Sequence, residues 1–293
     1  MSFRILLKAF KPIRLISLVM TYLLGAGLVQ YVREMKSWTV FIQGGVFLLL
    51  FYLTLEYLRL LQTLADPQYW PDGLKENEAK QIRLLIAIIT ATFLTVVTTI
   101  MISWLHSGIL WQGLVFLLSG LIILGGIYYL CIVIASLRQF EILIEILFFI
   151  VIPPALAYFL QSDNPHNLLT MVVIALVPAF LANRLLSLLQ SYAIDRKLGL
   201  ESIVVQIGWE NAMVYHNALI LLSYFIYALM ALLGFPWFLM WPVFLTLPIG
   251  LLQIWLMERV KRGMKPLWKV MRFAVACVLF IPIYLLGFAF WIR

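Results

Sequence analysis

Two segments of the chain place side chains at four-residue intervals, the spacing that puts them on one face of a helix. The first set is Gln62, Asp66 and Trp70, and the second is Ser187, Ser191 and Asp195. Each set contains one carboxylate and at least one neutral side-chain oxygen. If both segments are helical, each presents its oxygen atoms together, so these segments are the first candidates for a polar site.

Two further groups of charged residues lie in or beside apolar sequence. Glu56 and Arg59 are three residues apart. Arg138, Glu141 and Glu145 follow one another at spacings of three and four, which place them on one face of a helix. A charge within a membrane span is costly and marks either a cavity or a structural ion pair. Glu56 and Arg59 could pair locally. The second group could reach the mouth of a cavity or form a surface pair.

The elements that must position these residues are nine apolar runs. Each is long enough, at helical rise, to cross the hydrocarbon core of a bilayer. The runs span about 12–32, 38–61, 84–105, 109–133, 139–160, 167–189, 214–234, 237–257 and 270–291. The chain is 64% hydrophobic and 12% charged, which excludes a soluble globular protein. Because lipid offers no hydrogen bonds to the backbone, the runs are predicted to be helices.

Positive charge is sorted to one side of these runs. When the connections are numbered alternately, one set contains Arg33, Lys36 and Arg293, leaving 18 of the 21 Lys and Arg residues in the other. The positive-inside rule then places the N-terminus in the cytoplasm and the C-terminus outside. Anionic lipid headgroups are the ordinary counter-charge for such loops. None of the loops carries the basic stripe of a nucleic-acid-binding protein, so no nucleic-acid partner is predicted.

The sequence predicts a single all-α polytopic membrane domain over residues 1–293. Its longer loops, at about 62–83, 190–213 and 258–269, all fall on the predicted cytoplasmic side. The outer connections are short. Polar chemistry is therefore expected on one face, the reverse of a receptor for an external ligand.

The loops after the second and sixth helices resemble those of the UbiA-type intramembrane prenyltransferase superfamily. Lys11-Pro12 is similar to the basic-Pro start of that family. The stretch from Asp195-Arg196-Lys197 through Gly199 to Ile207-Gly208 is similar to its second loop, in which an acidic residue, a basic pair and a glycine precede a short aliphatic run. The architecture resembles the family over nearly the whole chain, and the motifs over about thirty positions.

The resemblance implies nine transmembrane helices around a central apolar cavity that holds a prenyl chain. In the family, carboxylates of both loops bind Mg²⁺, which takes oxygen ligands and neutralises the departing diphosphate. An aromatic or quinone-precursor acceptor then takes the prenyl group. Carried over to this sequence, Asp66 and Asp195 are the catalytic carboxylates and Mg²⁺ ligands, Gln62 and Ser191 contribute neutral oxygens, and Arg196 and Lys197 contact the prenyl diphosphate.

The sequence departs from the family at the metal positions, because each loop keeps one carboxylate where the family has two or more. Trp70 at such a position is better explained as an anchor at the membrane interface. Asp72, Glu76 and Glu78 could supply the missing ligands or belong to a solvated loop. Two functions stay open: an active prenyltransferase, and a non-catalytic protein that binds an isoprenoid, quinone or pigment or serves as a subunit of a membrane complex. A small transporter is a third and weaker alternative.

Overall fold

A computed structural model describes residues 12–33, 35–65, 76–134, 137, 140–197 and 202–292. Every regular element in these ranges is helical. The helices are α2 (Pro12–Val32), α3 (Trp38–Thr63), α4 (Glu76–His106), α5 (Gln112–Val133), α6 (Glu141–Ile146), η3 (Leu147–Val151), α7 (Ile152–Phe159), α8 (Asn167–Lys197), α9 (Ile203–Ile207), α10 (Trp209–Leu232), α11 (Trp237–Met240), η4 (Trp241–Thr246), α12 (Leu247–Lys261) and α13 (Trp268–Ile292).

The described part of the chain forms nine helical spans long and apolar enough to cross a membrane. This confirms the nine runs and an integral, multi-pass membrane protein. The helices extend further than the apolar runs at two places that matter for function. Helix α4 begins at Glu76, and α8 continues to Lys197, so Ser191 and Asp195 are helical and do not lie in the loop predicted at 190–213. Hydropathy detects only the apolar part of a helix, whereas backbone hydrogen bonds continue into its polar turns.

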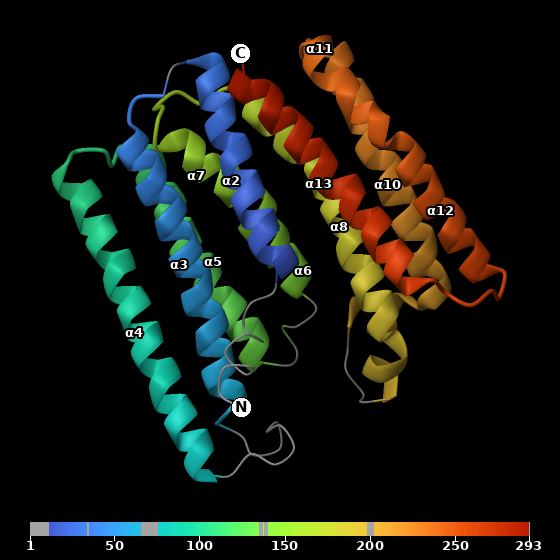
Figure 1. The fold of residues 1–293 in the computed structure, drawn as a ribbon, viewed down its shortest axis with the longest axis horizontal. Helices are drawn as coiled ribbons and strands as arrows, with labels where there is room; N and C mark the ends of the chain where they lie inside the picture. Colours follow the sequence, from blue (N-terminus) through green and yellow to red (C-terminus); the bar gives the residue numbers. More distant parts are fainter. Residues whose placement is uncertain are drawn as a thin grey trace.

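Successive spans run in opposite directions (Figure 1). The C-terminal ends of α3, α8 and α12 therefore lie at the same end of the bundle as the N-terminal ends of α2 and α6. We call this the basic end. Most Lys and Arg residues belong to one alternate set of connections in the sequence, and the described members of that set lie in the spans and connections that meet here. At the opposite end Lys36 Nζ lies 3.6 Å from a carboxylate oxygen of Asp163. That the basic end is cytoplasmic stays a prediction.

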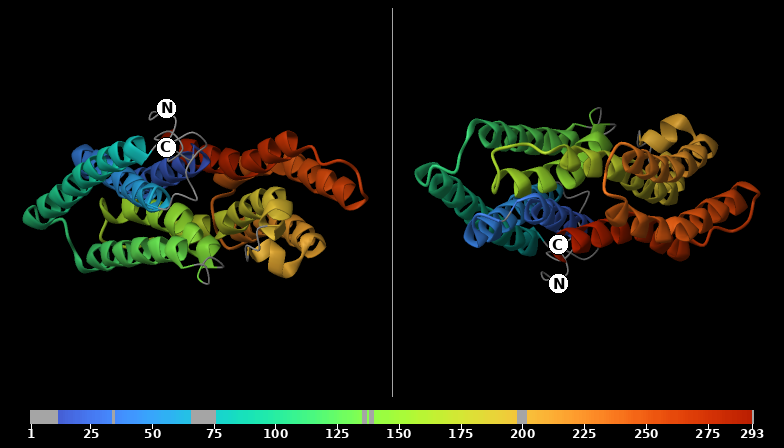
Figure 2. Two further views of the ribbon diagram at one scale, coloured as in Figure 1. Left: turned by 90° about the horizontal axis from the view of Figure 1, so that it is seen from below. Right: turned by 90° about the horizontal axis from the view of Figure 1, so that it is seen from above.

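The spans form two layers, seen end-on in Figure 2. One layer contains α3, α2, α13 and α12, and the other contains α5, the α6–η3–α7 span, α8 and α10. Helix α4 lies outside α3. The first described span, α2, packs against both α7 and the last helix, α13, so elements from the two ends of the sequence are brought together in the middle of the molecule.

One span is irregular. Residues Leu147–Val151 form a π-helical turn between α6 and α7. Pro153 and Pro154 follow directly, and neither can donate a backbone hydrogen bond. The Phe149 carbonyl oxygen accepts a hydrogen bond of 2.9 Å from the Thr21 hydroxyl, which ties the π turn to α2. Such turns insert an extra residue into a helix and are frequent beside functional sites.

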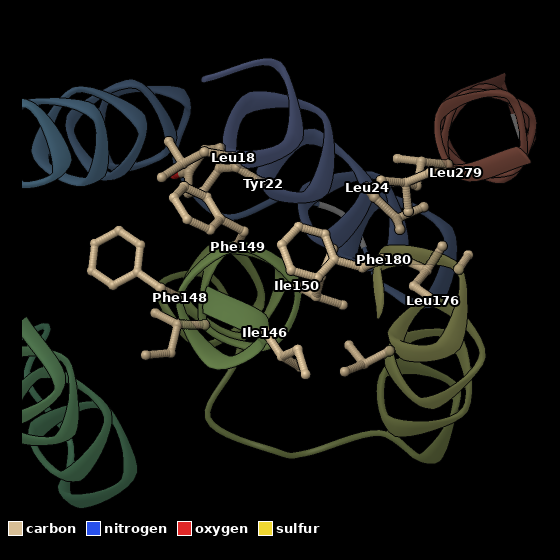
Figure 3. Packing of buried hydrophobic residues seen from close by; sticks show 14 of the residues in the cluster. Leu18, Tyr22, Leu24, Ile146, Phe148, Phe149, Ile150, Leu176, Phe180 and Leu279 are labelled. Carbon is tan, nitrogen blue, oxygen red and sulfur yellow. The ribbon is translucent and has the colours of Figure 1, made fainter. Parts of the chain in front are cut away.

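The interior between α2, η3 and α8 is filled with aromatic and aliphatic side chains (Figure 3). Phe149 and Ile150 lie on the π turn, and Phe180 reaches toward them from α8, with its ring centre 6.3 Å from that of Phe149, while Leu176 lies one turn away on α8. All four are almost completely buried. The central apolar cavity that the resemblance implies stays a prediction, and an apolar crevice to the side of this packed region is described below.

Candidate functional site

A network of charged side chains lies inside the bundle near its basic end. Arg14 of α2 is its centre: Nη1 donates a hydrogen bond of 3.0 Å to Glu56 of α3, and Nη2 bonds Glu145 of α6. Glu56 and Glu145 are 2% and 0% exposed. Glu56 lies seven residues before the end of α3, about 10 Å along the helix. Arg14 therefore contacts two carboxylates that the surrounding helices remove from water.

Two tyrosine hydroxyls complete the surroundings of Glu56. Tyr128 of α5 donates to Glu56 at 2.9 Å and accepts from Arg14 Nη1 at 2.8 Å. Tyr52, one turn earlier on α3, donates to Glu56 at 3.4 Å. The guanidinium of Arg14 also lies 6.0 Å from the centre of the Phe149 ring. The network thus joins α2, α3, α5 and α6, and most of its polar atoms have partners.

Helix α8 joins the network through Arg184, whose Nε forms an ion pair with Glu145 Oε2. Glu141 approaches two arginines, at 3.5 Å from Arg14 Nη2 and 4.0 Å from Arg59 Nη1. The predicted local pair of Glu56 with Arg59 is therefore replaced by pairs across helix interfaces, because Glu56 pairs with Arg14 and Arg59 approaches Glu141. Of the two alternatives for Glu141 and Glu145, a surface pair is wrong for Glu145, which is buried.

A pocket of about 510 Å³ opens beside this network. Its wall contains side chains from α2, α3, α6 and α8. They are Pro12, Ile13, Arg14, Ser17, Arg59, Glu141, Phe180, Asn183, Arg184 and Ser187. Three arginines and one glutamate thus line the pocket, whereas Glu56 and Glu145, which pair with Arg14, are not among its lining residues. We call it the arginine pocket; its size is that of pockets that take small organic ligands.

The second predicted segment continues from the arginine pocket toward the basic end. Asn183 and Ser187 line the pocket, and the four-residue steps carry the same face of α8 on to Ser191 and Asp195. The Ser191 hydroxyl donates to a carboxylate oxygen of Asp195 at 2.8 Å. Eight residues separate Asp195 from Ser187, about 12 Å along the helix, so the structure places Asp195 beyond the described pocket wall.

The neighbouring predicted ligands Arg196 and Lys197 are exposed in the last turn of α8. Gln62 lies in the last turn of α3, partly buried, and its amide oxygen is buried without a hydrogen-bond partner. Asp66, Trp70 and Asp72 lie outside the described residues. Helices α3 and α8 both contribute to the wall of the arginine pocket, through Arg59 and Ser187, and the joint role of Asp66 and Asp195 stays a prediction.

The two glutamates proposed as substitute ligands start α4. Glu76 is 71% exposed and pairs with Lys80 at 2.8 Å, four residues along the same helix. Glu78 is exposed as well. An acidic first turn is favourable at the positive end of the helix dipole. Both residues therefore fit the solvated alternative.

An apolar crevice lies between α2 and α3, with a volume of about 320 Å³. Val19, Leu23, Ile42 and Val46 are among its lining residues, and each is more than a third exposed, so the crevice opens sideways to the position of the lipid. Leu18 and Tyr22 form its inner wall. This side crevice has the apolar lining that a prenyl chain needs.

No protein-family model and no curated protein matches the sequence. Two solved structures do resemble the fold, both of a UbiA homolog from Archaeoglobus fulgidus. The one bound to GPP and Mg²⁺ aligns with a TM-score of 0.60 and 15% identity, over 99% of this chain and 100% of that one. The one bound to DMAPP and Mg²⁺ aligns with a TM-score of 0.56 and 13% identity, over 98% of each chain. This chain has the UbiA fold.

The resemblance in fold makes Mg²⁺ the metal whose fit must be tested on the residues themselves. Within the described ranges, no group of three His, Cys, Asp or Glu side chains is close enough to hold a metal ion. The predicted donors there are one carboxylate, Asp195, with the Ser191 hydroxyl and the Gln62 amide oxygen. Neutral oxygens do not offset the charge of a hard cation as carboxylates do. The described donors therefore do not fit the metal cluster that a diphosphate leaving group requires.

Sequence reasoning missed two of the three arginines that line the arginine pocket. Arg14 and Arg184 were counted only as positive charges of the cytoplasmic side, although both fall inside predicted apolar runs, at 12–32 and 167–189. A charge within an apolar run is itself the signal for a buried pair or a polar cavity. The partners of these arginines lie on other helices, 42 to 131 residues away for Arg14, so no local spacing identifies them.

A second buried polar group lies in the C-terminal part of the UbiA fold, between α10 and α12. The Gln253 amide donates to His216 Nε2 at 3.4 Å, and His216 Nδ1 donates to Asn217 Oδ1 at 3.3 Å. Asn217 in turn donates to Glu258 at 3.3 Å. His216 and Gln253 are completely buried. No local spacing in the sequence connects His216 with Gln253 or Glu258, because these residues are about forty positions away.

Proposed function

We propose that this protein binds a prenyl diphosphate and transfers its prenyl group to an aromatic or quinone-precursor acceptor within the membrane. The observation that carries the proposal is the pairing of two spaces along α2: the arginine pocket near the basic end and the apolar crevice further along the helix. Arg14, Leu18 and Tyr22 are four residues apart and share one face of α2. A ligand with an anionic head and an apolar chain matches this succession.

The reaction asks little covalent chemistry of the protein. The allylic carbon–oxygen bond breaks and the diphosphate leaves with the electron pair. The acceptor carbon then forms a new bond to the allylic carbon and loses a proton. The residues of the chain would bind the diphosphate, align the chain and keep water from the cation-like carbon, because preorganised charges stabilise the developing diphosphate anion.

The predicted roles of Asp66 and Asp195 in Mg²⁺ binding remain predictions. The solved UbiA homolog structures contain Mg²⁺, which supports a metal at this fold, whereas the described donors of this chain do not fit a metal cluster. No step is therefore assigned to the metal here. Arg196 and Lys197, exposed beside Asp195, are proposed to meet the diphosphate as it enters or leaves.

The non-catalytic alternative is favoured by a separate observation. The buried carboxylates Glu56 and Glu145 are engaged by arginines, and the acids of the predicted motifs are reduced to Asp66 and Asp195. A chain with this site could bind an isoprenoid, quinone or pigment without transferring it, alone or in a membrane complex.

Turnover by the purified protein separates the two functions. Geranyl diphosphate and a hydroxybenzoate-type acceptor are supplied with Mg²⁺, and the prenylated product is followed by mass spectrometry. We expect product from the wild type and none from Asp66→Asn, because one of only two predicted metal-binding carboxylates is lost. Asp163→Asn, at the opposite end of the bundle, is the matched control and should retain activity. Binding of the diphosphate without product would establish the non-catalytic alternative.

A further inference from the structure

We infer that the arginine pocket binds a phosphate-type anion directly through guanidinium groups, without requiring Mg²⁺. The inference rests on the proposed function in taking a prenyl diphosphate as the main ligand. It differs from the implication of the family resemblance, in which carboxylates hold the anion through metal ions. The charges on the pocket wall, the free donors and the missing metal ligands each support it.

The charges on the pocket wall favour an anion. Arg14, Arg59 and Arg184 face the pocket with Glu141 as the one carboxylate among its described lining residues. Glu56 and Glu145 balance the arginines from behind and do not appear in the wall. The carboxylates therefore hold the guanidinium groups in place, while the positive charge is presented to the pocket.

Two of the three arginines keep donors for a ligand. Arg184 pairs with Glu145 through Nε, and its two terminal amino groups have no partner among the residues that the structure describes. Arg59 Nη1 is buried and makes no hydrogen bond, since Glu141 lies 4.0 Å away. A buried donor without a partner costs free energy that a ligand oxygen would recover. The planar guanidinium matches two oxygens of a phosphate at once.

The part of the pocket wall that α8 forms carries no carboxylate among its described lining residues. Asn183 and Ser187 occupy the α8 face of the wall, and Ser191 continues it with a neutral hydroxyl. Arginine donors bind a diphosphate without neutralisation by a metal. The arginines of this pocket could therefore hold the anion where the described α8 face offers no carboxylate.

The test is equilibrium binding to the purified full-length protein in nanodiscs of zwitterionic lipid. Geranyl diphosphate is titrated in EDTA and in Mg²⁺, against wild type, Arg59→Gln and Arg184→Gln. Arg262→Gln, an exposed arginine of the connection between α12 and α13, is the matched control. Arg59→Gln is the decisive variant, because Arg59 is partly exposed and its loss leaves Glu141 with Arg14, so folding should be preserved.

We expect wild-type affinity in EDTA to lie within about threefold of that in Mg²⁺, and Arg59→Gln to weaken it at least about tenfold, the usual effect of losing a charged hydrogen bond. Binding that needs Mg²⁺ and is unchanged in Arg59→Gln would overturn the inference and leave the proposed function intact. Absence of geranyl diphosphate binding in both buffers would overturn the proposed function.

Two competitors identify the source of the anion. Inorganic diphosphate is the first competitor and is tested in EDTA. If it displaces geranyl diphosphate from the wild type but not from Arg59→Gln, the anionic head is recognised by itself. Nanodiscs with phosphatidylglycerol that abolish binding in the same arginine-dependent way would support a phosphate site open to lipid headgroups. Displacement by neither competitor, together with affinity unaffected by Arg59→Gln, would show that the prenyl chain alone is recognised and would overturn the inference.

Discussion

The two buried polar groups of this protein differ in charge and in what lies beside them. Near the basic end of the N-terminal part, Arg14, Glu56, Glu145 and Arg184 form ion pairs from four helices, and a pocket opens next to them. Between α10 and α12, the side chains in the fully buried part are neutral, and their contacts are 3.3–3.4 Å long.

This difference separates a neutral polar group, which helix packing explains, from a charged one, for which we propose a role in binding. A neutral hydrogen-bonded pair can hold two helices together at small cost. Buried ions are expensive and are seldom the best way to stabilise an interface, since well-packed apolar residues often do better. Stability alone therefore does not explain why charged side chains are buried here. Binding of an anion in the adjacent arginine pocket, as proposed above, would explain it. Four predictions test this comparison, from the largest expected effect to the smallest.

Removing the central charge should have the largest effect. Arg14→Leu leaves Glu56 and Glu145 buried with less compensation, and loss of one partner from a buried ion pair costs about 3–5 kcal/mol. We expect a clearly lower thermal unfolding midpoint in detergent. Arg262→Leu, on the surface, should leave the midpoint unchanged. The charged network would not stabilise the fold if both variants melted with the wild type.

The closeness of helix packing should differ between the two parts as well. A Cβ atom on Gly25 would lie 2.7 Å from the carbonyl carbon of Pro154, whereas one on Gly250 would meet the movable ring of Tyr224 at 2.8 Å. We expect Gly25→Ala to cost about 1–3 kcal/mol, because α2 and α7 must separate, and Gly250→Ala to cost less. Gly120→Ala, in open space on α5, serves as the control. Equal unfolding midpoints for the first two variants would contradict this.

Restoring acids should convert the anion site toward metal dependence. With Gln62→Asp and Ser191→Asp together, Mg²⁺ should tighten geranyl diphosphate binding about tenfold more than in the wild type, equivalent to about 1.4 kcal/mol. The new carboxylates offset the charge of the cation, which amide and hydroxyl oxygens do not. Titrations with and without Mg²⁺ measure the ratio. An unchanged ratio would mean that Asp66 and Asp195 do not face a common metal position.

The neutral group should show the smallest effect. His216→Leu or Gln253→Leu alone should cost about 1 kcal/mol, because each leaves one buried partner unsatisfied. The double variant should recover most of that loss, since both polar partners are replaced by apolar groups. Thermal unfolding of the three variants and the wild type measures the coupling. A double variant as unstable as the sum of the singles would show that His216 and Gln253 do not act as a pair.

The sequence by itself determined the membrane class, the nine spans and the side of the bundle that is basic. These properties follow from composition along the chain: the length of an apolar run sets whether it crosses a bilayer, and lipid forces it to be helical. The boundaries were less well determined. Helix α8 continues through Ser191 to Lys197, because a helix does not end where its apolar face ends.

Only the tertiary structure decided which charges act together. Arg14 reaches Glu145 across 131 residues, and Arg184 reaches the same carboxylate from another helix. Such pairs depend on how the helices are arranged in two layers, and no spacing within one helix records it. The predicted polar stripe on α8 was found from its four-residue steps, whereas the arginines that complete the pocket emerged only when α2, α3 and α8 were brought together around it.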